Sequence, residues 1–144
     1  MSKTAFQDAQ LLLQLYELRR EERLRQARAW FTESFRAQTL QEMNELCPPG
    51  SPAHASFRMM ISYWEMVASF IVKGAVSDKD LFFENSGELL FVWARVESLL
   101  PEFREQFKDP YILKNLEVVA QEFIEWRENR APGSWEAFKQ RINS

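Results

Sequence analysis

The chain has 144 residues, of which 46% are hydrophobic and 14% aromatic, with a formal net charge of −3. A chain of this length buries about two-thirds of its unfolded surface, so we expect one domain over residues 1–144 that needs neither disulfides nor metal. The acidic balance argues against a nucleic-acid partner, because such binding needs clustered positive charge. The single cysteine, Cys47, excludes an internal disulfide and is compatible with a reducing cytoplasm, where we expect the protein.

The first third of the chain predicts one long helix or two broken ones. Helical spacing relates a set of apolar residues, namely Leu11, Leu15, Leu18, Leu24, Ala27, Phe31 and Phe35. Residues 17–28 between them contain five arginines and three glutamates, which we interpret as a solvated face; a basic surface for anionic lipid or RNA is the alternative. The apolar run at residues 11–15 is too short to span a bilayer, so no transmembrane segment is expected.

A shorter helix is expected over residues 40–46, and Cys47-Pro48-Pro49-Gly50 then breaks the chain. Ser51 and Pro52 open a longer helix that is apolar on most of its circumference and ends at Gly74. Such a helix belongs in the interior, with neighbours on several sides.

A second long helix is predicted from a cap at Ser77 to Phe107, with Pro101 kinking or ending it. Gly87 in its middle either permits close helix packing or marks a break. The short link makes the two helices antiparallel neighbours, a hairpin over residues 51–107. Further helices are predicted from Asp109-Pro110 and from Ser134. The fold class is therefore all-α, an antiparallel bundle of about five to six helices around this hairpin.

The central stretch also resembles a known family. The residues that carry the resemblance are Tyr63, Trp64, Glu65, Gly74, the segment 77–81, Trp93 and Arg104. Their spacing resembles a group of small all-helical bacterial proteins that are classified only as a domain of unknown function, over about residues 10–107. The resemblance implies a helical fold and a bacterial source, and it implies no activity. Some relatives carry a membrane helix ahead of this region, and this chain has almost nothing before its first helix.

Residues that could carry catalysis or bind metal are few. His54 is the only histidine, so a metal site or a nucleophilic pair with Cys47 would have to use it, and a surface histidine beside a loop cysteine is the favoured interpretation. Glu122, Glu125 and Glu128 follow at helical spacing without the histidines of a di-iron bundle, and a solvated face is favoured. We therefore assign no catalytic residue, no metal ligand and no cofactor.

One acidic residue lies inside the longest apolar block, residues 61–72. A carboxylate in an apolar interior needs a partner or a proton, so we expect Glu65 to be partly buried and paired. Arg95 on the neighbouring helix is the candidate partner, with Tyr63 and Trp93 as further polar groups. These four residues form the candidate buried polar or ligand site. The pair either fixes the register of two helices or marks a binding site.

Three functions remain open. The first is a helical interaction or scaffold protein that binds a protein partner or a second copy of itself. The second is a small-molecule sensor or carrier with an apolar pocket between helices. The third is an enzyme that uses carboxylates as acid and base, for which the sequence offers no mechanism.

Overall fold

The computed structural model describes the backbone of residues 3–143 and the side chains of residues 5–143. The helices, in chain order, are α1 (Lys3–Arg19), α2 (Glu22–Ser34), α3 (Leu40–Leu46), α4 (Pro52–Val72), α5 (Lys79–Glu84), α6 (Gly87–Val96), the 3₁₀ turn η1 (Glu97–Leu99), α7 (Leu100–Gln106), α8 (Lys114–Arg130) and α9 (Ser134–Asn143). No strand occurs in this part of the chain, so the all-α prediction is confirmed. The helices outnumber the five to six expected.

The ends of the central helix α4 follow from its sequence. The Ser51 hydroxyl accepts a hydrogen bond from the backbone N–H of His54 (3.1 Å), and Pro52 occupies the first turn. Past the other end, Gly74 adopts the left-handed conformation with φ of +81°. The next helix is capped by Asp78, which accepts from the N–H of Leu81 (3.1 Å), and not by the neighbouring serine that the sequence suggested.

The second helix of the expected hairpin is divided into α5, α6, η1 and α7. The first break falls directly before Gly87, where the side-chain amide of Asn85 donates to the carbonyl of Leu81 (2.9 Å) and takes the place of a helical backbone bond. The second break is η1, which precedes Pro101 in the first turn of α7; proline has no N–H with which to continue a helix. Of the two roles considered for Gly87, the break is the one observed.

Helix α8 begins later than the predicted Asp109-Pro110 start. The carboxylate of Asp109 instead accepts from the backbone N–H of Tyr111 (2.9 Å) and holds a turn. Lys108 and Leu113, on either side of this turn, both have φ of +53°, a left-handed conformation that interrupts a helix. The helix therefore starts only at Lys114.

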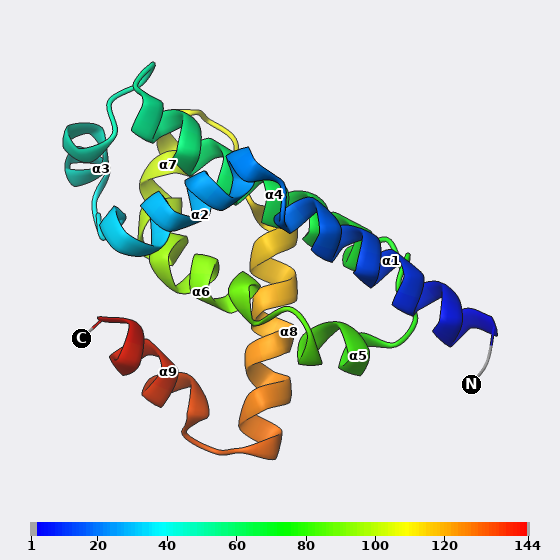
Figure 1. Ribbon diagram of the computed structural model, residues 1–144. Coiled ribbons are helices and arrows are strands. Elements are labelled where there is room, and N and C mark those ends of the chain that lie inside the picture. Colours follow the sequence, from blue (N-terminus) through cyan, green and yellow to red (C-terminus); the bar gives the residue numbers. More distant parts are fainter. Residues whose placement is uncertain (1–2, 144) are drawn as a thin grey trace.

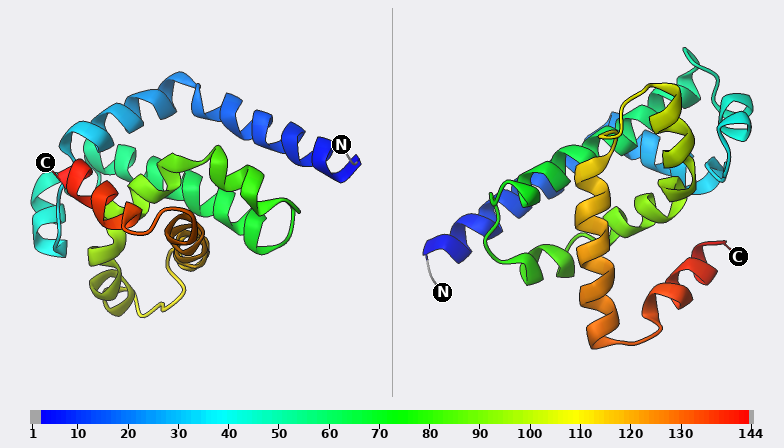
Figure 2. Two further views of the ribbon diagram at one scale, coloured as in Figure 1. Left: turned by 90° about the horizontal axis from the view of Figure 1, so that it is seen from below. Right: turned by 180° about the vertical axis from the view of Figure 1, so that it is seen from behind.

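Helix α4 lies at the centre of the structure, with α2 on one side and α8 on another. Figure 1 and the two views of Figure 2 show that α8 crosses α4 steeply, whereas α1 and α2 form a bent layer along it. The main neighbours of α4 are thus α2 and α8, and the segment that directly follows it in the chain packs against it less extensively. Its wide apolar surface explains why it has several partners.

The buried apolar side chains form one cluster that includes residues from α1 to α8. Aromatic rings join its parts: Phe35 stacks on Phe57 with ring centroids 4.9 Å apart, and Phe83 stacks on Phe123 at 4.7 Å. Such pairs add about 0.5–1.5 kcal/mol each beyond the area that they bury. Within residues 3–143, no helix combines the length and the hydropathy of a membrane span.

Candidate functional site

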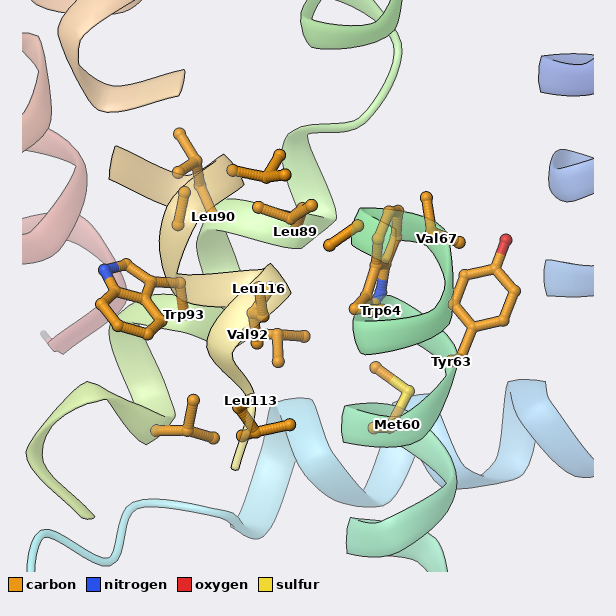
Figure 3. Packing of buried hydrophobic residues seen from close by; sticks show 14 of the residues in the cluster. Met60, Tyr63, Trp64, Val67, Leu89, Leu90, Val92, Trp93, Leu113 and Leu116 are labelled. Atoms are coloured by element: carbon orange, nitrogen blue, oxygen red, sulfur yellow. The ribbon is translucent and has the colours of Figure 1, made fainter. Parts of the chain in front are cut away.

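The four residues of the candidate polar site are placed apart. Figure 3 shows Tyr63 pointing from α4 toward the side where α1 lies, whereas Trp93 lies on the far side of Val92 and Leu116. Trp93 is buried, and its indole N–H has no hydrogen-bond partner among the described residues. It therefore belongs to the core.

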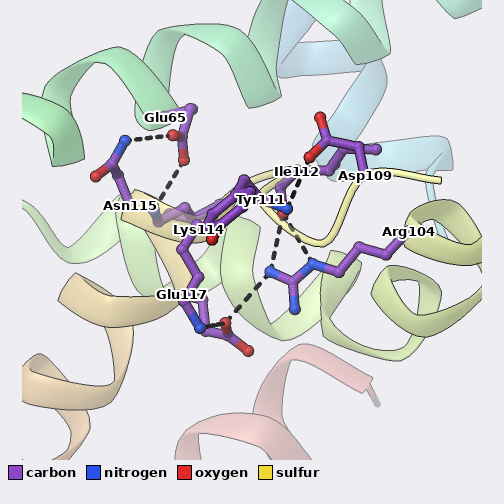
Figure 4. A network of polar contacts seen from close by, with 9 residues as sticks. Glu65, Arg104, Asp109, Tyr111, Ile112, Lys114, Asn115 and Glu117 are labelled. Atoms are coloured by element: carbon purple, nitrogen blue, oxygen red, sulfur yellow. Dashed lines mark hydrogen bonds and ion pairs between the residues drawn. The ribbon is translucent and has the colours of Figure 1, made fainter. Parts of the chain in front are cut away.

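Glu65 is half-buried, as expected, but its partner is not Arg95. Its carboxylate accepts hydrogen bonds from the side-chain amide of Asn115 (2.7 Å) and from the backbone N–H of Leu116 (2.8 Å), as Figure 4 shows. The predicted pairing is wrong because α8, and not α6, packs against this face of α4. Leu113, the residue before α8, makes no side-chain cap, so Glu65 supplies from another helix the acceptor that the first turn of α8 lacks.

A second polar group closes the same loop. The guanidinium of Arg104 donates twice to the carbonyl of Ile112 (3.0 and 2.9 Å) and pairs with Glu117 (3.2 Å), which Lys114 also contacts (3.0 Å). Burial acts to raise the pKa of the Glu117 carboxyl, but these hydrogen bonds outweigh it and the pKa is lowered. Together with Glu65, these contacts fix where α8 begins, and they have a structural role.

Arg95 is only 7% exposed, and its hydrogen bonds go to carbonyls and not to a carboxylate. It donates to the carbonyls of Phe35 and Ile142 (2.6 Å each), and its guanidinium lies 5.0 Å from the ring centroid of Phe91. Burial, together with the charge of Arg36, lowers the pKa of Arg95. A cation is favourable at the C-terminal end of a helix, so Arg95 holds the last turn of α9 against the end of α2.

A cleft lies between α1, α4 and α5, at a place that helical spacing alone did not predict. Its volume is about 310 Å³, and its lining residues are mostly apolar: Ala9, Leu12, Leu13, Leu15, Tyr16, Arg19, Tyr63, Trp64, Val67, Leu81, Asn85 and Ser86. One of the four predicted site residues, Tyr63, belongs to it.

Tyr63 separates the cleft from the core. Its hydroxyl donates to the backbone carbonyl of Leu15 in α1 (2.6 Å). Burial raises the pKa of the Tyr63 phenol to about 12, with smaller and opposing effects from the nearby charges of Arg19, Glu88 and Arg28. The phenol therefore stays neutral at physiological pH and acts as a hydrogen-bond donor that attaches α1 to α4.

Two residues of the lining, Arg19 and Trp64, belong to a group of four side chains that we call the Arg19 cluster. Its other members, Arg28 and Glu88, lie behind them and do not line the cleft. Glu88 accepts from the indole N–H of Trp64 (2.9 Å) through one oxygen, and its other oxygen pairs with Arg28 (2.6 Å) and Arg19 (3.2 Å). The guanidinium of Arg19 also lies 5.3 Å from the ring centroid of Trp64. The cluster joins α1, α2, α4 and α6.

Sequence reasoning missed the Arg19 cluster because it treated residues 17–28 as a solvated face. One signal was available, since a buried tryptophan needs an acceptor for its N–H. Trp64 lies in the helix that its apolar surface places in the interior, so its indole N–H needs a buried acceptor, which the structure shows to be Glu88.

The opposite end of α1 is also held by polar contacts. Asp8 is buried, and its carboxylate accepts from the backbone N–H groups of Ser77 (3.1 Å to each oxygen) and Asp78 (2.9 Å). These bonds connect the start of α1 to the turn between α4 and α5. One wall of the cleft is therefore attached at both ends by polar groups.

The residues considered for catalysis are engaged separately. Cys47 is fully buried, and burial raises the pKa of its thiol, which disfavours the reactive thiolate. Glu122 pairs with Lys79 (2.8 Å), and Glu128 accepts from the backbone N–H groups of Gly133 (2.7 Å) and of Trp135 (3.2 Å). Among the residues that the structure describes, no three His, Cys, Asp or Glu side chains are grouped as metal ligands.

The fold and the cleft define an all-helical protein with a small, mainly apolar cleft that ends in a charged cluster. Residues 4–139 match the family model of a domain of unknown function, DUF4760, and the chain belongs to that family. This confirms the resemblance drawn from residues 63–104. No curated protein and no solved structure matches the chain. The family description names no activity, so function has to be argued from the cleft.

Proposed function

We propose that the protein is a non-enzymatic sensor or carrier that holds a small, mainly apolar molecule in the cleft between α1, α4 and α5. The observation that carries the proposal is the cleft itself, whose volume of about 310 Å³ lies at the small end of known ligand sites, roughly 300–1,000 Å³. Its walls include Leu12, Val67 and Leu81, and its few polar groups include the guanidinium of Arg19, the kind of lining that orients a bound molecule.

The attachment of α1 supports this proposal. Among the described residues of α1, only Asp8 and Leu15 are buried, and polar contacts hold the helix near both ends. Elements with few buried apolar contacts open more easily than the core. A ligand could therefore enter by displacement of α1 while the packing of α4 with α2 and α8 stays intact.

Native mass spectrometry of the untagged protein purified from cells tests the proposal. We expect a small molecule bound one to one, and we expect Ala9→Phe, which fills the cleft from α1, to remove it. Ala29→Phe places the same side chain on the exposed surface of α2 and is the matched control. The neutral fluorescent probe naphthalene, which has ten non-hydrogen atoms, should bind with the same dependence on these variants. Absence of both a bound molecule and probe binding would contradict the proposal.

A protein interaction is the second candidate, and one observation favours it. Three large side chains of α1 are strongly exposed: Phe6 (55%), Leu13 (66%) and Tyr16 (53%). A group of exposed apolar side chains is typical of an interaction surface. A helix from a second copy of the chain could cover them. Sedimentation over a range of concentrations tests this, with Phe6→Glu as the disrupting variant because Phe6 does not line the cleft. A dimer that Phe6→Glu dissociates, together with no ligand in the cleft, would favour self-association.

A further inference from the structure

We propose that the ligand of the cleft is an anionic amphiphile, with one carboxylate at the Arg19 cluster and an unbranched apolar chain of about eight carbons along α1. This inference rests on the proposed function and adds the chemical class of the ligand. Three features carry it: the unbalanced charge of the Arg19 cluster, the unmatched donors of that cluster, and the mainly apolar lining of the rest of the cleft.

The charge of the Arg19 cluster is unbalanced. Arg19 and Arg28 pair with the same oxygen of Glu88, and no other ion pair joins either arginine within the described part of the chain. The cluster therefore carries one excess positive charge. The side chains of Arg19, Arg28 and Glu88 are only 20%, 24% and 13% exposed, so water screens this charge poorly. A half-buried cation without a counterion is unfavourable, and an anion at this place would remove the imbalance.

The donors of the cluster are also unmatched. The Nε of Arg19 and one terminal nitrogen of Arg28, Nη2, are buried without a hydrogen-bond partner among the residues that the structure describes. Nearly all buried polar groups in proteins find a partner, so an unmatched donor on Arg19, which lines the cleft, and another in the same cluster indicate that an acceptor is missing. A carboxylate fits, because it is planar, accepts on two oxygens and forms its strongest hydrogen bonds with guanidinium groups.

The other residues that line the cleft determine which chemical groups the rest of the ligand can have. Away from Arg19 the walls are formed by side chains such as Leu12, Val67 and Leu81, which favour an apolar chain. The hydroxyl of Tyr63 is already engaged with the carbonyl of Leu15 and offers no further donor. A volume of about 310 Å³ holds roughly ten groups of the size of a water molecule, at about 30 Å³ each. Octanoate, with ten non-hydrogen atoms, matches this size.

Calorimetric titration of the full chain with octanoate and with octanamide tests the inference, because the two ligands share shape and chain length and differ in charge. We expect octanoate to bind at least tenfold more tightly, as for a hydrogen bond to a charged group. Arg19→Gln should remove this preference. Glu88→Gln keeps an acceptor for Trp64 and raises the positive charge of the cluster, so it should strengthen octanoate binding several-fold without affecting octanamide. Arg20→Gln, an exposed arginine next in the chain, is the control and should change neither affinity.

The opposite effects of Arg19→Gln and Glu88→Gln distinguish a charge effect from structural damage, which would weaken both ligands in both variants. If Arg19→Gln fails to fold, the octanoate affinity of Glu88→Gln still tests the inference. An octanoate affinity of Glu88→Gln that is equal to or weaker than that of the parent would overturn the inference. Equal affinity of octanoate and octanamide would overturn it while leaving the cleft a binding site for neutral molecules. Failure of both ligands alongside binding of naphthalene would also overturn this inference alone. Failure of all three would overturn the proposed function as well.

Discussion

Helices α1 and α8 have the same length, 17 residues, and are held in opposite ways. Four apolar side chains of α8 are buried to 1% exposure or less: Leu116, Val119, Ala120 and Phe123. Helix α1 buries only Asp8 and Leu15 among its described side chains, with Leu11 and Leu12 partly buried against the core, and hydrogen bonds and an ion pair hold it near both ends. Helices of equal length are thus fixed mainly by apolar burial in one case and largely by polar contacts near both ends in the other. The second arrangement leaves a mainly apolar cleft beneath the helix.

The largest effect is expected from a truncation in α8. Phe123→Ala should lower the free energy of unfolding by about 3–5 kcal/mol, because it removes a ring that stacks on Phe83 and leaves a cavity in the core. Leu13→Ala in α1, where the side chain borders the cleft and is 66% exposed, should stay within about 0.5 kcal/mol of the parent. Urea denaturation measures both. Similar losses for the two variants would mean that α1 is packed as firmly as α8.

The next effect concerns the polar attachment of α1. Asp8→Ala should lower the free energy of unfolding by about 2–3 kcal/mol, because it leaves the N–H groups of Ser77 and Asp78 without their charged acceptor. The loss should be accompanied by faster hydrogen exchange in α1 and unchanged exchange in α8. Glu17→Ala, an exposed acid on the same helix, is the control for charge. A loss for Asp8→Ala no greater than that for the control would contradict the assigned role.

The corresponding loss of stability for α8, from removal of a polar contact at its first turn, is expected to be smaller. Glu65→Ala should lower the free energy of unfolding by about 1–2 kcal/mol, the usual effect of removing a helix cap, since Glu65 accepts from the first turn of α8. Glu125→Ala removes an exposed acid from α8 itself and should change stability by less than about 0.5 kcal/mol. Thermal or urea unfolding measures the stabilities of the two variants. Equal stabilities would show that Glu65 is not a cap.

The smallest effect is expected at Tyr63 of α4, the helix that contacts both α1 and α8. Tyr63→Phe should lower the free energy of unfolding by about 1 kcal/mol through loss of its hydrogen bond to Leu15. Because burial raises the pKa of Tyr63 to about 12, above the unfolded value of about 10, the stabilisation is present below pH 10 and is lost as the pH rises through 12. Absorbance titration at alkaline pH should show one tyrosine ionising near 12, and this step should be missing in Tyr63→Phe. If the parent and the variant differed by a tyrosine that ionises near 10, the phenol would not be buried.

Features determined by neighbouring residues were predictable from the sequence. The helix over residues 40–46 has the predicted bounds, and Ser51, Pro52 and Gly74 mark the ends of α4 as expected. Caps, prolines and left-handed glycines act within one turn, so a single sequence contains the needed information. The prediction of one continuous helix from residue 77 was wrong because three weak helix breakers, Asn85, Ser86 and Gly87, act together.

Contacts between distant helices were not predictable in the same way. Glu65 was correctly expected to be half-buried, but its partner depended on whether α6 or α8 covers that face of α4, and helical spacing does not reveal this. Arg19 and Arg28 have spacings typical of a solvated face, yet both reach Glu88, sixty or more residues away. The cleft exists because α1 is held by such long-range polar contacts, and so it is not visible in the sequence.

Native-state hydrogen exchange of α1 and α8, with and without octanoate, tests most directly whether α1 is a separately opening wall of a ligand cleft. Amides in α1 should exchange through an opening whose free energy is well below that of global unfolding, whereas those in α8 should exchange only on global unfolding. Octanoate should slow exchange in α1 more than in α8, since it binds only while α1 is closed. Equal protection of the two helices without ligand, unchanged by octanoate, would contradict both the polar attachment of α1 and the cleft beneath it as a binding site.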